Sequence, residues 1–288
     1  HPVSVLRVKG RDSLVAMVFD ADPWKCYLDP FRGGAETVAR TARALAVAGA
    51  EPLGLTDCLN FPSPEVPEQY WVLEECVKGM AACCEAIGCP VVSGNVSLYN
   101  ESPEGAILPT PVVGTVGIIP SFREYLPSGN WDEGDVLFMV GPCNTSLAGS
   151  RYLRSRNLPL SGRPLEFWGE AEKDFIQRAL RTARSGAASS GRAIAGGGLA
   201  AALVKDSAES GKGAAVSLGI PTRKDVVLFG EGGARALYSV PMGKVPLFKV
   251  IWNGYPCIVL GRVGGSSLEV EDAFGFTVEE LGKKWRIR

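Results

Sequence analysis

The chain has 288 residues, of which 46% are hydrophobic and 21% are charged, enough to bury a substantial core in one or two domains. Its 30 basic and 31 acidic residues give a formal charge of −1, so charge gives no reason to expect nucleic acid or a membrane as partner. No apolar run is long enough to span a bilayer, and the N-terminus lacks the layout of a secretory signal, so a cytoplasmic protein is expected.

The first part of the chain alternates strand and helix patterns. Residues 13–28 predict two strands joined by a turn at Asp20, Asp22 and Pro23. After a break at residues 29–34, the pattern predicts a helix at 35–48, a buried strand at 52–56, a helix at 68–87, a strand that starts at 91 and a strand at 111–119.

A polar stretch rich in proline, glycine and acidic residues at 120–135 is the best domain boundary. We therefore predict two domains of similar size, residues 1–122 and residues 134–288, in an α/β or α+β fold. In the second domain the pattern predicts strands at 136–140, 214–218, 226–229, 236–240, 256–261 and 268–270, and helices at 170–187, 199–208 and 278–285.

Cysteine and histidine usage excludes several kinds of chemistry. The eight cysteines form no Cys-x-x-Cys pair and lie mostly in apolar segments, which indicates reduced, packed thiols and no zinc site. The single histidine is His1, so the remaining chain offers no histidine for acid–base catalysis. We assign no catalytic residue to this chain.

Polar residues where two predicted strands end form the candidate site. A carboxylate such as Asp57 can bind magnesium or accept from ligand hydroxyls, but aspartate also forms local turns. Gly94 permits close approach of a ligand, Asn95 offers an oxygen to a cation, and Ser97 offers a hydroxyl to a phosphate. A loose hairpin or a bulged strand explains the residues from 93 onward without a ligand.

Two glycine-rich runs precede predicted helices and are weaker candidates for anion binding. Arg32-Gly33-Gly34 combines helix-terminal amides with an arginine, although paired glycines more often serve the turn itself. Gly196-Gly197-Gly198 contains no cation or acid, so close packing is the favoured interpretation there.

The chain resembles the second half of phosphoribosylformylglycinamidine synthase, the large subunit of an amidotransferase of purine biosynthesis. The similarity lies in YLDPFRGG at residues 27–34, TDCLNF at 56–61 and, most specifically, SGNVSLYNE at 93–101. Weaker similarity continues through residues 141–153, 197–203 and 228–240, so the resemblance covers nearly the whole chain.

The resemblance implies an aminoimidazole ribonucleotide synthetase-like unit, with an N-terminal domain that pairs through its sheet with a second such domain and a C-terminal α/β domain. It implies an ATP-dependent ligase with magnesium, in which ATP phosphorylates the formamide oxygen and ammonia from a glutaminase subunit displaces the phosphate. A small accessory subunit is also implied. By motif, Asp57 and Gly94 would contact ATP, Asn95 would bind magnesium, and Ser97 would contact the substrate phosphate.

The chain also departs from the family. It has no catalytic histidine of the first half, and Asn60-Phe61-Pro62-Ser63-Pro64 stands where Asn-Phe-Gly-Asn-Pro is usual. Residues 193–199 lack the acids of the family's Asp-x-Ser-Asp/Glu-Gly-Gly-Leu run, and Glu231-Gly232-Gly233 replaces a Glu-Ser-Gln-like run. The C-terminal domain is therefore expected to support catalysis without performing it.

Three hypotheses follow. The first is that the chain supplies half of a composite ATP site, is inactive alone, and pairs with the first half or with a second copy. The second is a non-catalytic scaffold half that binds a nucleotide only structurally or not at all. The third is a relative such as selenophosphate synthetase, which ranks last because the chain lacks that group's reactive cysteine and aspartate-rich metal runs.

Overall fold

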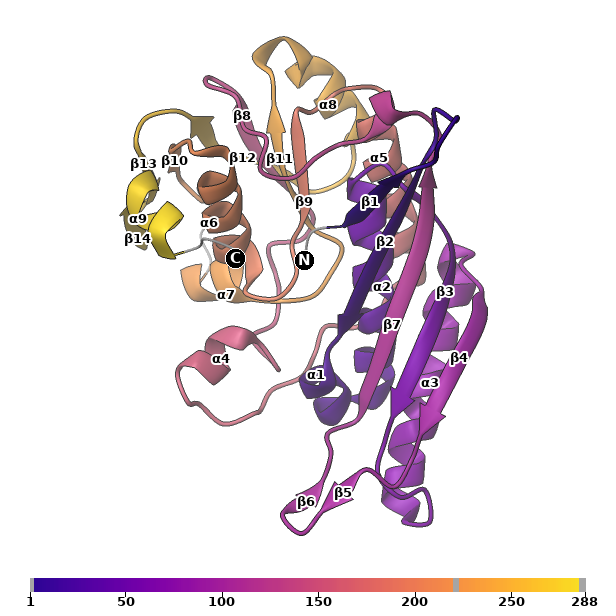
Figure 1. Ribbon diagram of the computed structural model, residues 1–288. Helices are drawn as coiled ribbons and strands as arrows, with labels where there is room; N and C mark the ends of the chain where they lie inside the picture. The colour runs from indigo at the N-terminus through magenta and orange to yellow at the C-terminus, as the bar shows by residue number, and fades with distance from the viewer. Residues whose placement is uncertain (1–2, 220–222, 285–288) are drawn as a thin grey trace.

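The computed structural model describes residues 3–219 and 223–284 and consists of two sheets with helices packed on them (Figure 1). The five-stranded sheet has the order β1-β2-β7-β3-β4, and the seven-stranded sheet has the order β14-β13-β10-β12-β8-β11-β9. The hairpin β5–β6 projects from the end of the first sheet.

The elements of the first part fall within residues 4–119. They are β1 (Ser4–Arg7), β2 (Leu14–Ala21), α1 (Pro23–Leu28), α2 (Pro30–Val47), β3 (Glu51–Asn60), α3 (Pro67–Ile87), β4 (Val91–Ser97), β5 (Glu101–Ser102), β6 (Gly105–Ala106) and β7 (Thr110–Ile119).

The elements of the second part follow a short 3₁₀ turn at Phe122–Glu124. They are β8 (Val136–Val140), α4 (Arg151–Ser155), α5 (Gly169–Arg184), β9 (Ser190–Ala193), α6 (Gly198–Ser210), β10 (Ala214–Val216), α7 (Lys224–Phe229), β11 (Ala236–Val240), α8 (Val245–Ile251), β12 (Cys257–Val263), β13 (Ser267–Val270), β14 (Phe274–Thr277) and α9 (Val278–Lys284).

The predicted second strand within residues 13–28 is wrong, because the chain forms helix α1 there. Asp22 caps this helix by accepting from the backbone N–H of Lys25, and Pro23 occupies the first turn, where it loses no hydrogen bond. Asp29 and Pro30 repeat the arrangement at the start of α2, which therefore begins before the predicted residue 35.

Another error is the strand predicted at 226–229, which is the helix α7. A run of four apolar residues does not distinguish a buried strand from a helical turn. The buried Arg235 donates to the carbonyl oxygens of Val227 and Gly230 and so satisfies the C-terminal end of this helix. Arg235 directly precedes β11, and it contacts α7 only in the folded chain, so no local sequence pattern predicts this contact.

The two sheets differ in how they are covered. Helices α2 and α3 pack on one face of the five-stranded sheet, and the other face is open in Figure 1. The seven-stranded sheet is buried on both faces, with α5 and α8 over one core and α6, α7 and α9 over the other. Strands β8 and β11 are accordingly buried at every residue.

Helix α2 also joins the two parts, because it packs against α5. The buried Arg43 on α2 donates to Glu36, and its Nε and Nη2 donate to Glu172 on α5, each at 2.7 Å. These paired charges fix α2 between the two sheets. Within the described ranges, no helix combines the length and apolar character that crossing a membrane requires.

Candidate functional site

The structure places the four predicted site residues on adjacent parallel strands, because β3, α3 and β4 form one βαβ unit. In the β3–β4 register Asp57 lies opposite Gly94, Cys58 opposite Asn95, and Asn60 opposite Ser97. Residues far apart in the sequence therefore have neighbouring backbones at one end of the sheet.

Asp57 does not end its strand. Strand β3 continues to Asn60, because the following residues also pair with β7 on the other side. Asp57 lies opposite the fully buried Val113 of β7, so its side chain points to the face covered by helices. Partial burial raises the pKa of the Asp57 carboxyl above its ordinary value.

Gly94 serves the side chain of Asp57. A Cβ atom at Gly94 would lie 2.6 Å from Oδ1 of Asp57, closer than nonbonded atoms tolerate. The absence of a side chain at this position therefore lets the carboxylate lie over β4. The Asp57 side chain is thus enough to require glycine at position 94, without a ligand.

Asn95 and Ser97 point to the opposite, open face of the sheet. Asn95 Nδ2 lies 3.6 Å from Sγ of Cys58, its neighbour across the pair of strands. Next to them, the hydroxyls of Thr56 and Ser93 are hydrogen-bonded at 2.8 Å. These side chains form an uncharged polar row, which we call the polar row (Thr56, Cys58, Ser93, Asn95 and Ser97).

The hairpin interpretation of residues 93–101 is wrong, because β4 is an edge strand that pairs in parallel with β3 and ends at Ser97. The bulged-strand alternative agrees with the pairing register, which shifts between Val91 and Ser93. The turn comes after β4. Asn100 Nδ2 donates to the carbonyl oxygens of Ser97 and Phe61 at 2.8 and 3.1 Å, and Tyr99 adopts a positive φ of 60°. Asn100 is thus the residue that fixes the end of β4.

A ligand bound on one face of the sheet can contact the side chains of only two of the four predicted site residues. Asp57 and Gly94 lie on the helix-covered face, and Asn95 and Ser97 lie on the open face. In the part of the chain that the structure describes, no group of three or more His, Cys, Asp or Glu side chains could hold a metal ion. Magnesium favours carboxylate and phosphate oxygens, so these residues alone do not fit a magnesium site.

The glycines after Arg32 have a packing role. They lie inside α2, where any Cβ at Gly33 or Gly34 would overlap the backbone of Cys26 or Cys76. Arg32 itself pairs with Asp29 and donates to the carbonyl oxygen of Pro164 at 2.8 Å. The structure therefore supports the turn-and-packing interpretation of this run.

Sequence reasoning missed the residues around Gly196–Gly198. The Gly197 N–H donates to the buried carboxylate of Glu231 at 2.7 Å, and Arg151 lies against Gly196. Arg192 and Lys205 line the same hollow at the start of α6. In the sequence Glu231 differs from the family only by its neighbours Gly232 and Gly233, and the cations come from elements too distant for any local pattern to predict them.

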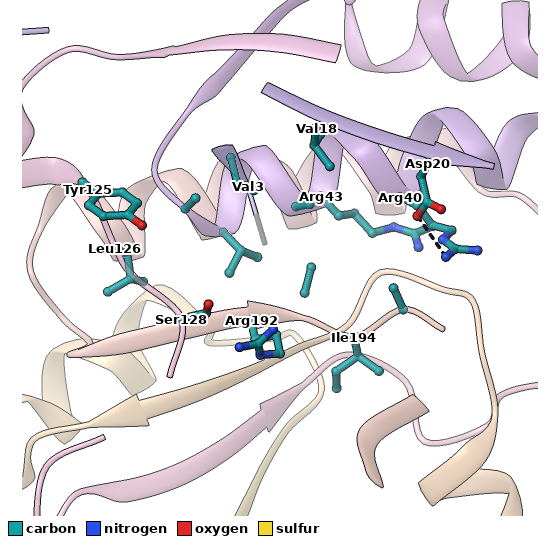
Figure 2. A pocket seen from close by; sticks show the side chains of 16 residues that line it. Val3, Val18, Asp20, Arg40, Arg43, Tyr125, Leu126, Ser128, Arg192 and Ile194 are labelled. Atoms are coloured by element: carbon teal, nitrogen blue, oxygen red, sulfur yellow. Dashed lines mark ion pairs between the residues drawn. The ribbon is translucent and has the colours of Figure 1, made fainter. Parts of the chain in front are cut away.

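A second cavity of about 70 Å³ lies between α2 and β9 (Figure 2). Arg40 lines it and forms an ion pair with Asp20 at 2.9 Å, and Arg192 lies on the opposite wall. The buried Nε of Arg40 has no hydrogen-bond partner among the described residues. The cavity has room for a few water molecules, which suit that donor better than an organic ligand does.

Residues 3–119 match the family model for "AIR synthase related protein, N-terminal domain". Over nearly its whole length, the chain is homologous to phosphoribosylformylglycinamidine synthase subunit PurL. It is 40% identical to PurL of Moorella thermoacetica over 98% of this chain, and 41% identical to PurL of an Anaeromyxobacter species over 94%. The resemblance inferred from residues 56–61 and 93–101 is confirmed.

The chain spans 39% and 37% of those two relatives. Solved structures show the same fold at low identity. T. maritima PurL complexed with FGAR has a TM-score of 0.82 and 18% identity, with coverage of 98% of this chain and 48% of that one. PurLQS from Thermotoga maritima (98% and 46% coverage) and T. maritima PurL complexed with ATP (97% and 46%) both give 0.77 at 19% identity. The synthetase-like α/β fold is confirmed.

Proposed function

We propose that this chain works as the second synthetase-like half of a phosphoribosylformylglycinamidine synthase, an ATP-dependent carbon–nitrogen ligase of purine biosynthesis. The observation that carries the proposal is 40% identity to PurL over 98% of the chain. Because the chain spans 39% of that relative, the rest of the active site would lie elsewhere. The isolated chain is therefore expected to be inactive. We propose a cytoplasmic localisation.

The open face of the five-stranded sheet is the proposed pairing surface. Phe19, Val116 and Ile118 are exposed there, and Phe19 covers Gly114, so one half of the face is apolar. Burial of such a patch by the first half, or by a second copy, is the expected stabilising contribution. In this proposal residues 1–122 pair and residues 134–288 flank the site. The PurLQS structure from Thermotoga maritima supports the proposal of further subunits, and we propose a glutaminase and a small accessory subunit for this role.

The proposed ligand contacts divide between the two faces of the sheet. Asn95 and Ser97 share the open face with the pairing surface, so we propose that they meet the bound ligand, with Ser97 near its phosphate. Asp57 and Gly94 remain the proposed ATP contacts, reached from the covered side. Asn95 would be one magnesium ligand among several, and the others would have to come from ATP and from the other half.

Titration calorimetry with Mg-ATP tests these roles. Binding is measured on this chain alone and again after addition of the separately purified first half of the same synthase. We expect the mixture to bind and the Asp57→Ala, Asn95→Ala double variant to bind at least about tenfold more weakly, a loss of about 1.4 kcal/mol. Ser102→Ala, on the exposed β5–β6 hairpin, is the control. Equal binding by the double variant rejects the assigned contacts.

A specific observation favours a second candidate, the scaffold half. Ala193 and Gly196 stand where the family carries acids, and the described residues include no metal-binding acidic cluster. A scaffold predicts tight association with the first half and full synthase activity even when Asp57 and Asn95 are replaced. Activity of the reconstituted complex therefore separates the two proposals.

A further inference from the structure

Residues 151–163, which we call the flap, form an exposed excursion from the second part of the chain. The flap contains the short helix α4, and no residue in it is buried, whereas Ser150 before it and Pro164 after it are both buried. In Figure 1 helix α4 of the flap lies at the lower left, below α6 and α7. A segment without buried side chains contributes little apolar burial to its own attachment, and such segments open at low free-energy cost.

The strongest of these contacts is made by Glu231. Its Oε1 accepts from the backbone N–H of Arg151 at 2.8 Å and from that of Gly197 at 2.7 Å. Its Oε2 lies 3.6 Å from Nζ of Lys25 on α1. This carboxylate, only 3% exposed, therefore joins the start of the flap to the glycine run before α6 and to the first part of the chain.

Two aromatic contacts hold the body of the flap. Tyr152 stacks on Phe229 at the end of α7, with ring centroids 4.5 Å apart and an interplanar angle of 11°. The guanidinium carbon of Arg154 lies 3.4 Å from the centre of the Trp24 ring on α1. Tyr152, Phe229 and Trp24 are half-buried and Arg154 is exposed, so neither contact is made between fully buried side chains.

The flap lies over a hollow. Arg151 lines this hollow with Arg192, Gly196 and Lys205, and its Nε would lie 2.6 Å from a Cβ at Gly196. The far end of the flap is tied down separately, because the carbonyl oxygen of Arg163 accepts from Ser146 Oγ at 2.8 Å. The contacts over the hollow can therefore be released while the far end of the flap stays attached.

We propose that the flap is a lid that opens about Ser150 and Pro164 over the hollow at the start of α6, with Glu231 as its latch. The carboxylate binds the lid and the floor of the hollow at once, so its two hydrogen bonds form and break with closure. Opening exposes Gly196 and the basic side chains beneath it. This inference does not depend on the proposed function.

Hydrogen exchange measured by mass spectrometry on the full chain tests the lid. In Glu231→Ala, which removes the oxygen that accepts both hydrogen bonds, we expect exchange of the Arg151 and Gly197 amides to rise at least about tenfold, because hydrogen bonds to a charged group are the strong ones. Glu231→Gln keeps a neutral acceptor and should restore part of the protection. Arg154→Ala should raise exchange about threefold in the flap alone, by loss of its contact with Trp24.

Glu104→Gln, on the exposed β5–β6 hairpin, is the control and should change nothing in the flap. If Glu231→Ala raises exchange equally in β8 and β11, the carboxylate is a general structural support and the latch is rejected. If neither Arg154→Ala nor Tyr152→Ala changes exchange in the flap, the lid itself is rejected. Those two variants alter only side chains outside the buried core, so they keep the test valid even where Glu231→Ala does not fold.

Discussion

The two sheets of this molecule differ in how far helices cover their apolar side chains. The seven-stranded sheet carries helices on both faces and buries Phe138 to 1% exposure. The five-stranded sheet carries helices on one face only, and Phe19 on the open face is 63% exposed. Apolar residues on an uncovered face cost solubility, and this is the basis for proposing the open face as a pairing surface.

The same contrast holds for charge. In the first part, Arg43 binds two carboxylates and joins α2 to the second part. In the second part, the buried Asp206 pairs with Arg192, while its Oδ2 has no hydrogen-bond partner within the described residues. Glu36, one of the two carboxylates bound by Arg43, is therefore well compensated, whereas Asp206 is not. The free energy of unfolding should depend on pH in opposite directions for these two acids.

The largest expected effect compares the two sheets directly. Phe138→Ala removes a ring that packs 4.9 Å from Phe248 and should cost about 4 kcal/mol of unfolding free energy. The matched Phe19→Ala change on the open face should stay within about 0.5 kcal/mol. Urea unfolding of both variants measures the difference. Comparable losses would show that the open face is covered within the isolated chain.

The next effect separates the two acids by pH. Burial alone would raise the pKa of Glu36, but Arg43 outweighs it and lowers the pKa from 4.5 to about 2. The ionised form therefore stabilises the fold above pH 4.5, and up to about 3 kcal/mol is lost as the pH falls towards 2. Glu36→Gln should flatten that acid limb in urea unfolding measured from pH 6 to pH 2.

Asp206 provides the opposite sign. Burial raises its pKa from 3.8 to about 6, and Arg192 only partly offsets this. Stability from this group is present below pH 3.8 and is lost as the pH rises through 6. Asp206→Asn should therefore remove a loss between pH 4 and pH 7 and leave the Glu36 limb unchanged. A common pH response of both variants would contradict these assignments.

The smallest effect concerns the candidate site. Gly94→Ala places a methyl group against the Asp57 carboxylate and should cost about 1 kcal/mol, since an extra carbon in a packed position forces a shift. In an Asp57→Ala background the same change should cost almost nothing. A double-mutant cycle by urea unfolding measures this coupling, and additive losses would mean that Gly94 is needed for another reason.

Helix and strand positions could be predicted where a long periodic pattern ends at a clear signal. The helix predicted at 68–87 is α3, which spans Pro67–Ile87 and ends at Gly88 in a left-handed conformation. The apolar run at 226–229 is too short to distinguish a strand from helix α7. The pair Asp22-Pro23 caps helix α1 but is equally typical of a turn, so the sequence does not predict this helix.

The candidate site could be located but not oriented. The motifs at 56–61 and 93–101 identified adjacent strands correctly, because a strand–helix–strand unit brings its strands together. The faces could not be assigned, since side chains alternate along each strand and the exact register decides which face each residue takes. The contacts of Glu231 likewise depend on segments that meet only in the folded chain.

The sequence by itself determined the alternation of strands and helices, the family, and the run that carries Asp57, Gly94, Asn95 and Ser97. These follow from local periodicity and from residue identity. Only the tertiary structure decided that Asp57 and Asn95 face opposite ways, that one sheet face stays open, and that Glu231 ties a flap to the glycine run. Each of those depends on the pairing of distant strands and on burial, which set charge and exposure through contacts that no short stretch of sequence contains.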